Sequence, residues 1–581
     1  MRTQFMALAG PPSALARARA ERDWPARLPP GWSLFFEADG LLVVGRSGTP
    51  AITLPRGVVL GRLFDSATGA PVVRTDDRFA QAIDATEGRH LIERHWGSYC
   101  AILHGGQGGH WVLRDPSASL PVYVMEMSGL HCYFSDLASA LELQVVQDPD
   151  LDSAFLPQWL TFPFLRSART GLSSVKELLP GSLRRVRNGL AEILPLWSPW
   201  TFADRAGMLD DFAEAAARLR EVALTTIASQ AAGCGSMVLE LSGGLDSSVI
   251  AAAFKAADLP FMSVNFATRS ADGDERRFAR TVAEATGARH FEVVEQQASV
   301  DLALPDRRRL RPGLSAVVAP LHRDMAAFGE AAGGETFVTG AGGDNVFCYL
   351  TTAAPVVDAA RERGLAFAAR TALHDVSELC GCTMWTTARF ALRKRLRSRN
   401  APAFKAETDF LRADAVADVP DPHPWLQPPP GALPGKREHI ASLMRIHHNL
   451  DPETRLSDRP FLHPLMDQPI VELCLGIPTW LWVHGGQNRA VARAAFDGLL
   501  PRDILNRRSK GRLESMCLRA YLAHRMQLAD LLLGGQLRAD GLIDADALEA
   551  YLEREEAPSD ARYYRIFELA SAELWARSWR G

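Results

Sequence analysis

Short apolar runs separated by turn-forming residues dominate the first third of the chain. They occupy residues 40–45, 99–104, 111–115, 122–124 and 130–134, with Gly, Pro or Asp close to each. Runs of this length between turn formers are typical of the strands of a layered sheet structure. The pattern therefore predicts a β-rich first domain.

The pattern changes near residue 203. From there to residue 230 the chain is rich in Ala and Arg with apolar residues at helical spacing, and helical patterns continue to the C-terminus. We predict two domains, over residues 1–202 and 203–581. A proline-rich insertion at 419–435 lies in the second domain. Because Pro lacks an amide donor, we expect an ordered loop or a mobile lid there rather than regular helix or strand.

One segment of the second domain carries a pattern suited to chemistry. A short apolar strand pattern at 236–241 leads into Ser-Gly-Gly-Leu-Asp-Ser-Ser at 242–248, and a helical run follows at 249–257. A strand, a glycine turn and a helix N-terminus direct amide N–H groups and the helix dipole at one spot, which makes an anion site. Asp246 would repel a bare phosphate, but it suits a Mg²⁺ ion that bridges carboxylate and phosphate oxygens. The Gly-Lys-Ser/Thr of a Walker loop is missing.

Composition and charge narrow the class of protein. The chain has 581 residues, of which 47% are hydrophobic and 23% charged, with a net charge of −4 and a pI near 6.4. These values are typical of a globular protein and lack the basic excess that coating a nucleic acid requires. We expect no membrane span, because no run of about 18 apolar residues occurs, and the short apolar N-terminal stretch does not predict a signal peptide. We therefore expect a cytoplasmic protein that binds no nucleic acid.

The 242–248 loop resembles the pyrophosphate loop of the asparagine-synthetase family, whose members cleave ATP between the α- and β-phosphates and adenylate a carboxylate. Residues 261–266 resemble the second strand of that family, and residues 339–347 resemble its second glycine-rich turn. Stretches of the first domain follow the order of the family's glutaminase-like layer, at 95–99, 113–115, 121–123 and 134–136. The resemblance implies an α/β protein with an N-terminal Ntn-hydrolase-like αββα sandwich, inactive as a glutaminase. An α/β ATP-pyrophosphatase (adenine nucleotide α-hydrolase-like) synthetase domain follows it.

The resemblance also assigns roles to single residues. Asp246 and Asp344 are the expected ligands of Mg²⁺, and Arg489 and Lys510 are the expected charge stabilisers beside the α-phosphate. These four residues form the expected catalytic set. The residues expected to bind ATP and pyrophosphate are Leu241, Ser242, Gly243, Gly244, Leu245, Asp246, Ser247, Ser248, Val264, Thr339 and Gly340.

Three departures from the family pattern bear on the reaction. Arg2 follows the initiator Met where a working glutaminase has its nucleophilic Cys, so we expect that ammonia is not the amine used. Ala341 stands where asparagine synthetases have Glu and β-lactam synthetases have Tyr. Arg489 replaces the family's Lys, and Arg keeps the charge but is a poor proton donor at neutral pH. Whether another base replaces the side chain missing at Ala341 stays open.

A peptide α-amine suits such a site, because its pKa of about 7.7–8.0 leaves roughly a quarter to two-fifths of it neutral near pH 7.5. Strings at 61–64, 342–347, 464–473 and 508–511 resemble lasso peptide macrolactam synthetases. That resemblance implies adenylation of an Asp or Glu side chain in a precursor peptide, followed by attack of the peptide's N-terminal amine. An isopeptide ring, AMP and pyrophosphate result. A leader-peptidase and a leader-binding protein are the further partners implied.

Two other functions are weighed against this hypothesis. An asparagine synthetase or β-lactam-type amide ligase would need the catalytic side chains that Ala341 and Arg489 replace. A non-catalytic scaffold of the same fold would have no need of both Asp246 and Asp344.

Some residues outside these motifs are also candidates. The basic run at 389–399 is either a peptide- or nucleic-acid-binding helix or a solvated helix face, and we favour the solvated face. His322, His463 and the pair His447–His448 are candidates for the wall of a substrate cavity, against the alternative of ordinary structural histidines.

Overall fold

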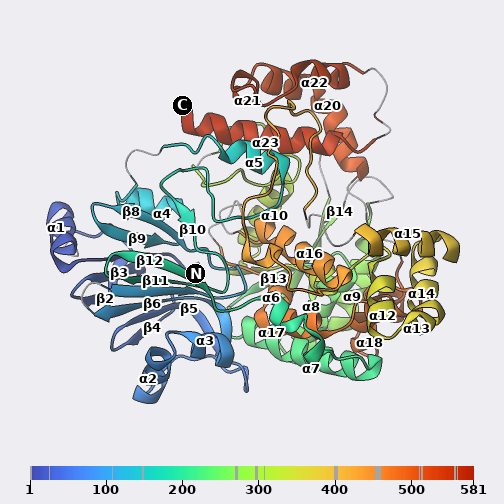
Figure 1. Cartoon of the computed structure of the whole chain (residues 1–581), viewed down its shortest axis with the longest axis horizontal. Helices are drawn as coiled ribbons and strands as arrows, with labels where there is room; N and C mark the ends of the chain where they lie inside the picture. The colour runs from blue at the N-terminus through green and yellow to red at the C-terminus, as the bar shows by residue number, and fades with distance from the viewer. Residues whose placement is uncertain are drawn as a thin grey trace.

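The computed structural model describes residues 3–24, 27–106, 109–146, 150–267, 273–294, 299–305, 308–397, 404–451, 459–508, 511, 514–554, 558 and 560–580. A sandwich of two sheets forms one side of the molecule, and a helix-rich part built on a third sheet forms the other (Figure 1). Within these ranges, no helix has both the length and the apolar character needed to cross a bilayer.

The first domain contains two six-stranded antiparallel sheets, with strand orders β10-β8-β9-β1-β3-β2 and β12-β11-β7-β6-β5-β4. Their strands are β1 (Phe5–Ala9), β2 (Trp32–Ala38), β3 (Leu41–Arg46), β4 (Ala51–Leu54), β5 (Gly57–Asp65), β6 (His95–Gly106), β7 (Gly109–Arg114), β8 (Tyr123–Met127), β9 (Leu130–Phe134), β10 (Lys176–Glu177), β11 (Ser182–Arg187) and β12 (Leu190–Pro195).

Side-chain alternation along the strands packs these sheets between helices. Phe5 and Ala7 of β1 share one apolar cluster with Val58 of the other sheet, so the two sheets meet face to face. Met6 and Leu8, which point the opposite way, join the cluster beneath α1 (Pro12–Arg22) and α4 (Leu137–Glu142). The helices α2 (Asp77–Ala85) and α3 (Arg89–Arg94) cover the second sheet. The predicted αββα sandwich is confirmed.

The second domain is built on a parallel sheet with strand order β15-β14-β13-β16-β17. From the central strand β13 the chain adds β14 and β15 on one side, and it then crosses to add β16 and β17 on the other. Such a reversal leaves a crevice at the carboxyl ends of the two strands where it occurs. The strands are β13 (Met237–Glu240), β14 (Phe261–Ala267), β15 (Arg289–Val294), β16 (Thr336–Val338) and β17 (Phe461–Leu462).

Helices surround this sheet, and the last four, α20 to α23, form a layer beside α5 (Figure 1). They are α5 (Phe155–Thr161), α6 (Pro199–Phe202), α7 (Phe212–Ala231), α8 (Leu245–Ala256), α9 (Arg276–Thr286), α10 (Ala319–Ala331), α11 (Gly343–Val346), α12 (Ala354–Glu362), α13 (Leu365–Arg370), α14 (Ala372–Leu379), α15 (Met384–Arg397), α16 (Pro434–Leu450), α17 (Gln468–Gly476), α18 (Ala490–Ala495), α19 (Arg502–Leu505), α20 (Glu514–Leu533), α21 (Gln536–Ala539), α22 (Ala545–Leu552) and α23 (Tyr563–Arg580). The predicted boundary at 202/203 falls just after α6.

A buried ion cluster joins the two parts of the chain. The Glu177 carboxylate accepts from Arg114 at 2.6 Å and from Arg166 at 2.8 Å, and Arg311 of the second part lies 2.9 Å from it. Burial alone would raise the pKa of Glu177, but the three guanidinium charges outweigh burial and hold that pKa far below its usual range. Arg166 also pairs with Asp451 at 3.0 Å.

The proline-rich segment 419–435 crosses the same junction. It contains one 3-10 turn at Pro424–Leu426, and Trp425 within it is buried. Asp421 accepts from Arg169 at 3.0 Å, which ties the segment to the chain just after α5. The ion cluster and this segment together hold the chain around Arg166 and Arg169 against the second domain.

Candidate active site

The loop after β13 is shaped by two glycines. Gly243 has a φ of +65°, and a Cβ there would lie 2.4 Å from the backbone carbon of Phe278, so only glycine fits. Gly244 caps α8, and its N–H donates to the Ser242 hydroxyl at 3.2 Å. The Ser248 hydroxyl donates back to the Gly244 carbonyl at 2.7 Å. The loop is thus fixed with the N-terminus of α8 opening toward the crevice.

A second glycine turn, after β16, lies against the first. A Cβ on Gly340 would lie 2.7 Å from the Ser247 nitrogen, and a Cβ on Gly343 would lie 2.3 Å from Cγ of Asp246. Both glycines therefore permit a close approach that any other residue would prevent. This contact brings Asp344, in the short helix α11, to the side of Asp246.

One arginine bridges the two aspartates. Nη1 of Arg489 lies 2.7 Å from Oδ1 of Asp246 and 2.6 Å from Oδ1 of Asp344. Arg489 is 9% exposed and adopts a left-handed backbone with φ of +54° at the start of α18. Its guanidinium also lies 5.5 Å from the centre of the Tyr349 ring. Two carboxylates thus share one buried cation.

This donor set fits a magnesium ion. Mg²⁺ prefers oxygen ligands and is commonly held by one or two carboxylates together with substrate phosphates. Oδ1 of Asp246 and Oδ1 of Asp344 lie within 2.7 Å of one nitrogen, so a single ion at that position would reach both. Among the described residues, no group of three or more metal-binding side chains occurs, and phosphate oxygens would have to complete the coordination.

Two further arginines line the same cavity, and the sequence reasoning missed both. Arg507 donates to the Gly243 carbonyl at 3.1 Å and to Glu275 at 2.7 Å, with its guanidinium 3.9 Å from the centre of the Phe278 ring. Arg493 donates to the Asn488 side chain at 2.8 Å. Burial and the neighbouring Arg489 lower the pKa of Arg493 to about 10. In the sequence, the only indication for Arg493 is that it stands four residues after Arg489, which places the two on one side of a helix.

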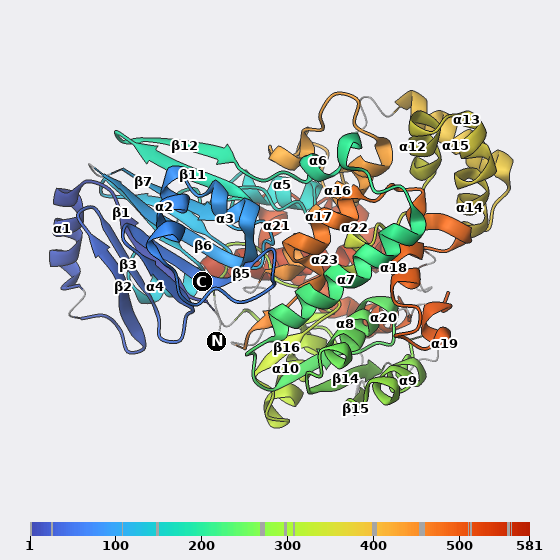
Figure 2. The ribbon, with the colours of Figure 1, turned by 90° about the horizontal axis from the view of Figure 1, so that it is seen from below.

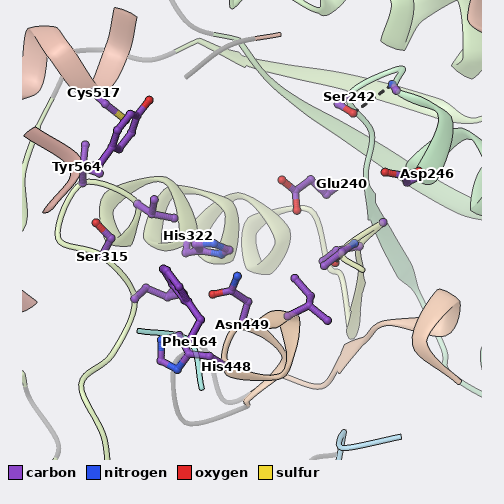
Figure 3. Close-up of a pocket in the computed structure, with 18 of the residues that line it drawn as sticks. Phe164, Glu240, Ser242, Asp246, Ser315, His322, His448, Asn449, Cys517 and Tyr564 are labelled. Carbon is purple, nitrogen blue, oxygen red and sulfur yellow. Dashed lines mark hydrogen bonds between the residues drawn. The ribbon is translucent and has the colours of Figure 1, made fainter. Parts of the chain in front are cut away.

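These loops open into a cavity of about 690 Å³ (Figure 3). Ser242 and Asp246 lie at one end, and Tyr564 and Cys517 of the C-terminal helices lie at the other. The apolar residues that line the cavity include Trp159, Leu160, Phe164, Leu314, Val317 and Tyr564. The first domain's chain after α5 therefore contributes to the wall, which the sequence analysis did not foresee.

Polar side chains lie between the two ends. Glu240, at the end of β13, His322 of α10 and Asn449 of α16 occupy the middle of the view in Figure 3. His448 also lines the cavity, and burial lowers its pKa to about 4, so its ring is neutral at pH 7. Glu568 pairs with Arg565 at 2.9 Å.

The predicted site residues fall into two groups. Those that line the cavity are Ser242, Gly244, Leu245, Asp246, Ser247, Thr339, Gly340 and Arg489. Leu241, Gly243, Ser248, Val264 and Asp344 lie behind this wall or beside it. Val264 is fully buried within the sheet, because β14 continues past it to Ala267, and its carbonyl accepts from the Leu241 N–H at 2.8 Å.

The remaining candidates have other positions. His322 and His448 line the cavity, whereas His447 packs its ring edge-on against Trp425, 5.1 Å between ring centres. His463 lies 3.1 Å from the Thr339 hydroxyl, behind the second glycine turn. Lys510, assigned a charge-stabilising role from the sequence, lies outside the described residues, as does Arg2.

The fold and the site define a class: an αββα sandwich joined to an α/β domain whose serine-glycine loop and paired aspartates suit a nucleotide with its metal. A family model described as Asparagine synthase matches residues 218–577, and the chain belongs to that family. It is accordingly an ATP-dependent amide-bond-forming ligase, of a family whose members release AMP and usually use Mg²⁺.

The other comparisons add little. Two solved structures share 10% identity with the chain at a TM-score of 0.21. One is described as the allosteric regulatory enzyme of purine biosynthesis, with 52% of this chain and 76% of that chain covered. The other is glutamine phosphoribosylpyrophosphate amidotransferase from B. subtilis with ADP and GMP, with 58% and 90% covered. At such TM-scores neither likeness bears on the fold, which rests on the sheets themselves. No curated protein matches the chain.

Proposed function

We propose that this ligase closes a macrolactam ring in a ribosomally made lasso peptide. It would adenylate an Asp or Glu side chain of the precursor peptide, and the peptide's N-terminal amine would then form the isopeptide bond. The observation that carries the proposal is the shape of the cavity, which continues from the nucleotide loop into an apolar chamber shared by both parts of the chain.

The walls of that chamber favour a peptide over a small acid. A free amino acid such as aspartate would need charged groups close to the reacting carboxylate. Here Trp159, Phe164 and Tyr564 offer aromatic faces that suit peptide side chains, and the charged groups Arg565 and Glu568 are paired with each other. Ala341 lines the cavity beside the loop with no side chain able to take a proton, which suits an amine that is partly neutral at the working pH.

The roles of the residues follow from their positions. The amides at the start of α8 would hold the pyrophosphate, and Asp246 with Asp344 would hold Mg²⁺, which neutralises phosphate charge when bound. Arg489 would then leave the two carboxylates and bind beside the α-phosphate, where negative charge develops. Glu240 faces the cavity at the end of β13, and its carboxylate would attract the peptide's ammonium group and accept its proton.

Positioning would supply most of the rate. A folded peptide held with its amine against the activated carboxyl gains an effective molarity on the order of 10⁵–10⁸ M. The cavity would hold that arrangement and exclude water from the adenylate. A leader-peptidase and a leader-binding protein are proposed as partners, because the attacking amine must be freed from its leader.

The test uses the full-length protein with ATP, Mg²⁺ and synthetic core peptides whose N-terminus is free. We expect AMP to form only with a peptide that carries an internal Asp or Glu, together with a product lighter by one water. The matched peptide with Asn or Gln at that position should give neither product. A peptide with an acetylated N-terminus should support pyrophosphate exchange but close no ring.

Two outcomes would overturn the proposal. AMP formation with free aspartate and ammonium, and none with any peptide, would make the chain a small-molecule amide ligase. A protein that forms no AMP with either substrate set, while it still binds ATP, would be a scaffold. The variant Glu240→Gln tests the proton acceptor: it should keep pyrophosphate exchange and slow ring closure most at low pH.

A further inference from the structure

The helix α15 lies at the edge of the molecule farthest from the first domain, beside α12, α13 and α14 (Figures 1 and 2). It is anchored along a narrow side. Thr387 and Ala391 are buried, and the Ser377 hydroxyl of α14 donates to the Thr387 hydroxyl at 2.8 Å. Lys394 pairs with Glu438 of α16. The rest of the helix surface faces outward.

The outward surface carries an apolar stripe. Trp385, Leu392 and Leu396 have 87%, 60% and 74% of their surface exposed. Their spacing of seven and four residues places them on one face of the helix. Phe390 is 53% exposed but lies about 140° around the helix from Trp385, outside the stripe. Large apolar side chains gathered on one exposed surface mark an interaction site more often than scattered ones do.

Cations flank the stripe. Arg389, Arg393 and Arg395 are exposed, and the sequence of the helix, 384–397, contains no Asp or Glu. At 100° per residue, Arg393 and Arg395 fall on opposite sides of the line through Trp385 and Leu392. Apolar residues with Trp at the centre and arginines on both sides form the pattern of helices that lie in the interface of an anionic bilayer.

We propose that α15 binds the surface of an anionic lipid membrane, with the apolar stripe in the headgroup region and the arginines against lipid phosphates. Trp and Leu gain by leaving water at that depth, and the arginine stems reach outward so that the guanidinium groups stay among the headgroups. The position of α15 at the edge of the molecule leaves the convex stripe accessible to a flat surface. The inference stands independently of the proposed peptide substrate.

The test is flotation of the full-length protein with large vesicles of phosphatidylcholine alone or of equal parts phosphatidylcholine and phosphatidylglycerol. We expect binding to the anionic vesicles only, and a bound fraction that falls as salt rises from about 0.05 M to 0.5 M because of screening. The variant R389Q/R393Q/R395Q should weaken binding roughly a hundredfold, since each cation near such a surface contributes about fivefold. The variant W385S/L392S/L396S should abolish binding.

A matched control uses two exposed apolar residues of the first domain. Leu190 and Ile193 of β12 are 78% and 58% exposed, and L190S/I193S should bind vesicles as the wild type does. Each variant is first shown to keep the wild-type circular dichroism and melting temperature. Equal binding to both vesicle types, no binding to either, or an equal loss in the control would overturn the proposal. Concentration-dependent dimers, or a stable complex with another protein, that W385S/L392S/L396S abolishes without any vesicle binding would show that the stripe is a protein interface instead.

Discussion

Replacing Arg489 by Met should destabilise the free protein and create an open metal site. The guanidinium lies between two carboxylates, 2.7 Å from that of Asp246 and 2.6 Å from that of Asp344. Without it, two negative groups face each other in a crevice with no cation between them. Mg²⁺ would then relieve the repulsion that Arg489 relieves in the wild type.

The expected loss of stability follows from the exposure of the two carboxylates, and the expected change in melting temperature follows from the size of the domain. A hydrogen bond between charged groups contributes about 1.5–3 kcal/mol when buried. The two carboxylates keep 17% and 30% of their side-chain surface exposed, so solvent screens the pair and we expect about 2 kcal/mol for both bonds together. For a domain the size of 218–577, the unfolding entropy is about 0.75 kcal/mol per kelvin. The melting temperature should therefore fall by about 3 °C.

The assay is thermal unfolding with and without Mg²⁺, in the absence of ATP. A carboxylate pair with a Kd of about 1 mM gains about 1.4 kcal/mol from roughly 10 mM Mg²⁺, so Arg489→Met should recover about 2 °C. The wild type should shift by much less, because the ion must first displace the arginine. Arg502→Met, at an exposed arginine at the start of α19, is the matched control and should behave as the wild type does.

Three results would refute the reasoning. If Arg489→Met melts at the wild-type temperature, the bridge does not stabilise the free protein. If Mg²⁺ raises the melting temperature of both proteins equally, the arginine and the metal do not share a site. The fall in melting temperature must also be absent in the control, or the loss reflects any removal of positive charge.

Three further predictions concern packing and buried carboxyl groups. Gly343→Ala would place a Cβ 2.3 Å from Asp246, force the two glycine turns apart and lower AMP formation by about a hundredfold or more. Burial raises the pKa of Glu472 to about 7, so the folded state keeps a proton that the unfolded chain releases above about pH 4.3. The free energy of unfolding therefore falls as pH rises from about 4.3 to about 7. At pH 8, Glu472→Gln should be more stable than the wild type by up to about 3 kcal/mol. Glu177→Gln should cost about 3–5 kcal/mol at pH 7. Because its arginines lower the pKa of Glu177, that difference should shrink as pH falls below about 4.3.

Each of these predictions has its own control and contradicting result. Gly207→Ala adds a Cβ where nothing lies within 4 Å, and it should leave AMP formation unchanged. An active Gly343→Ala would show that the turns need not touch. For Glu472→Gln, the melting temperature should not show the fall between pH 5 and pH 8 that the wild type shows. Equal falls in the two proteins would contradict the raised pKa. For Glu177→Gln, a deficit that does not depend on pH would mean that packing, not charge, holds the cluster together.

The sequence alone determined what depends on local chain geometry. The 242–248 loop was predicted as an anion site because a strand, two glycines and a helix start follow one another within a few residues, and the structure has that arrangement. Short apolar runs between turn formers predicted a β-rich first domain, and the resemblance to the asparagine-synthetase family implied that it is an αββα sandwich. The pairing of Asp246 with Asp344 came from the resemblance of two glycine turns, whose close contact the structure then gives.

Tertiary structure decided the rest, because contacts between distant segments leave no local pattern. Arg489 was expected beside phosphate, yet in the folded chain it bridges the two aspartates from a left-handed backbone position. Arg507 reaches the loop only because α19 ends beside it, and no spacing in the sequence indicates this. The cavity wall draws Phe164 from the first part of the chain and Tyr564 from near the C-terminus. The buried ion pair of Glu177 with Arg311 joins the same two parts of the chain, and it too forms only when folding brings distant segments together.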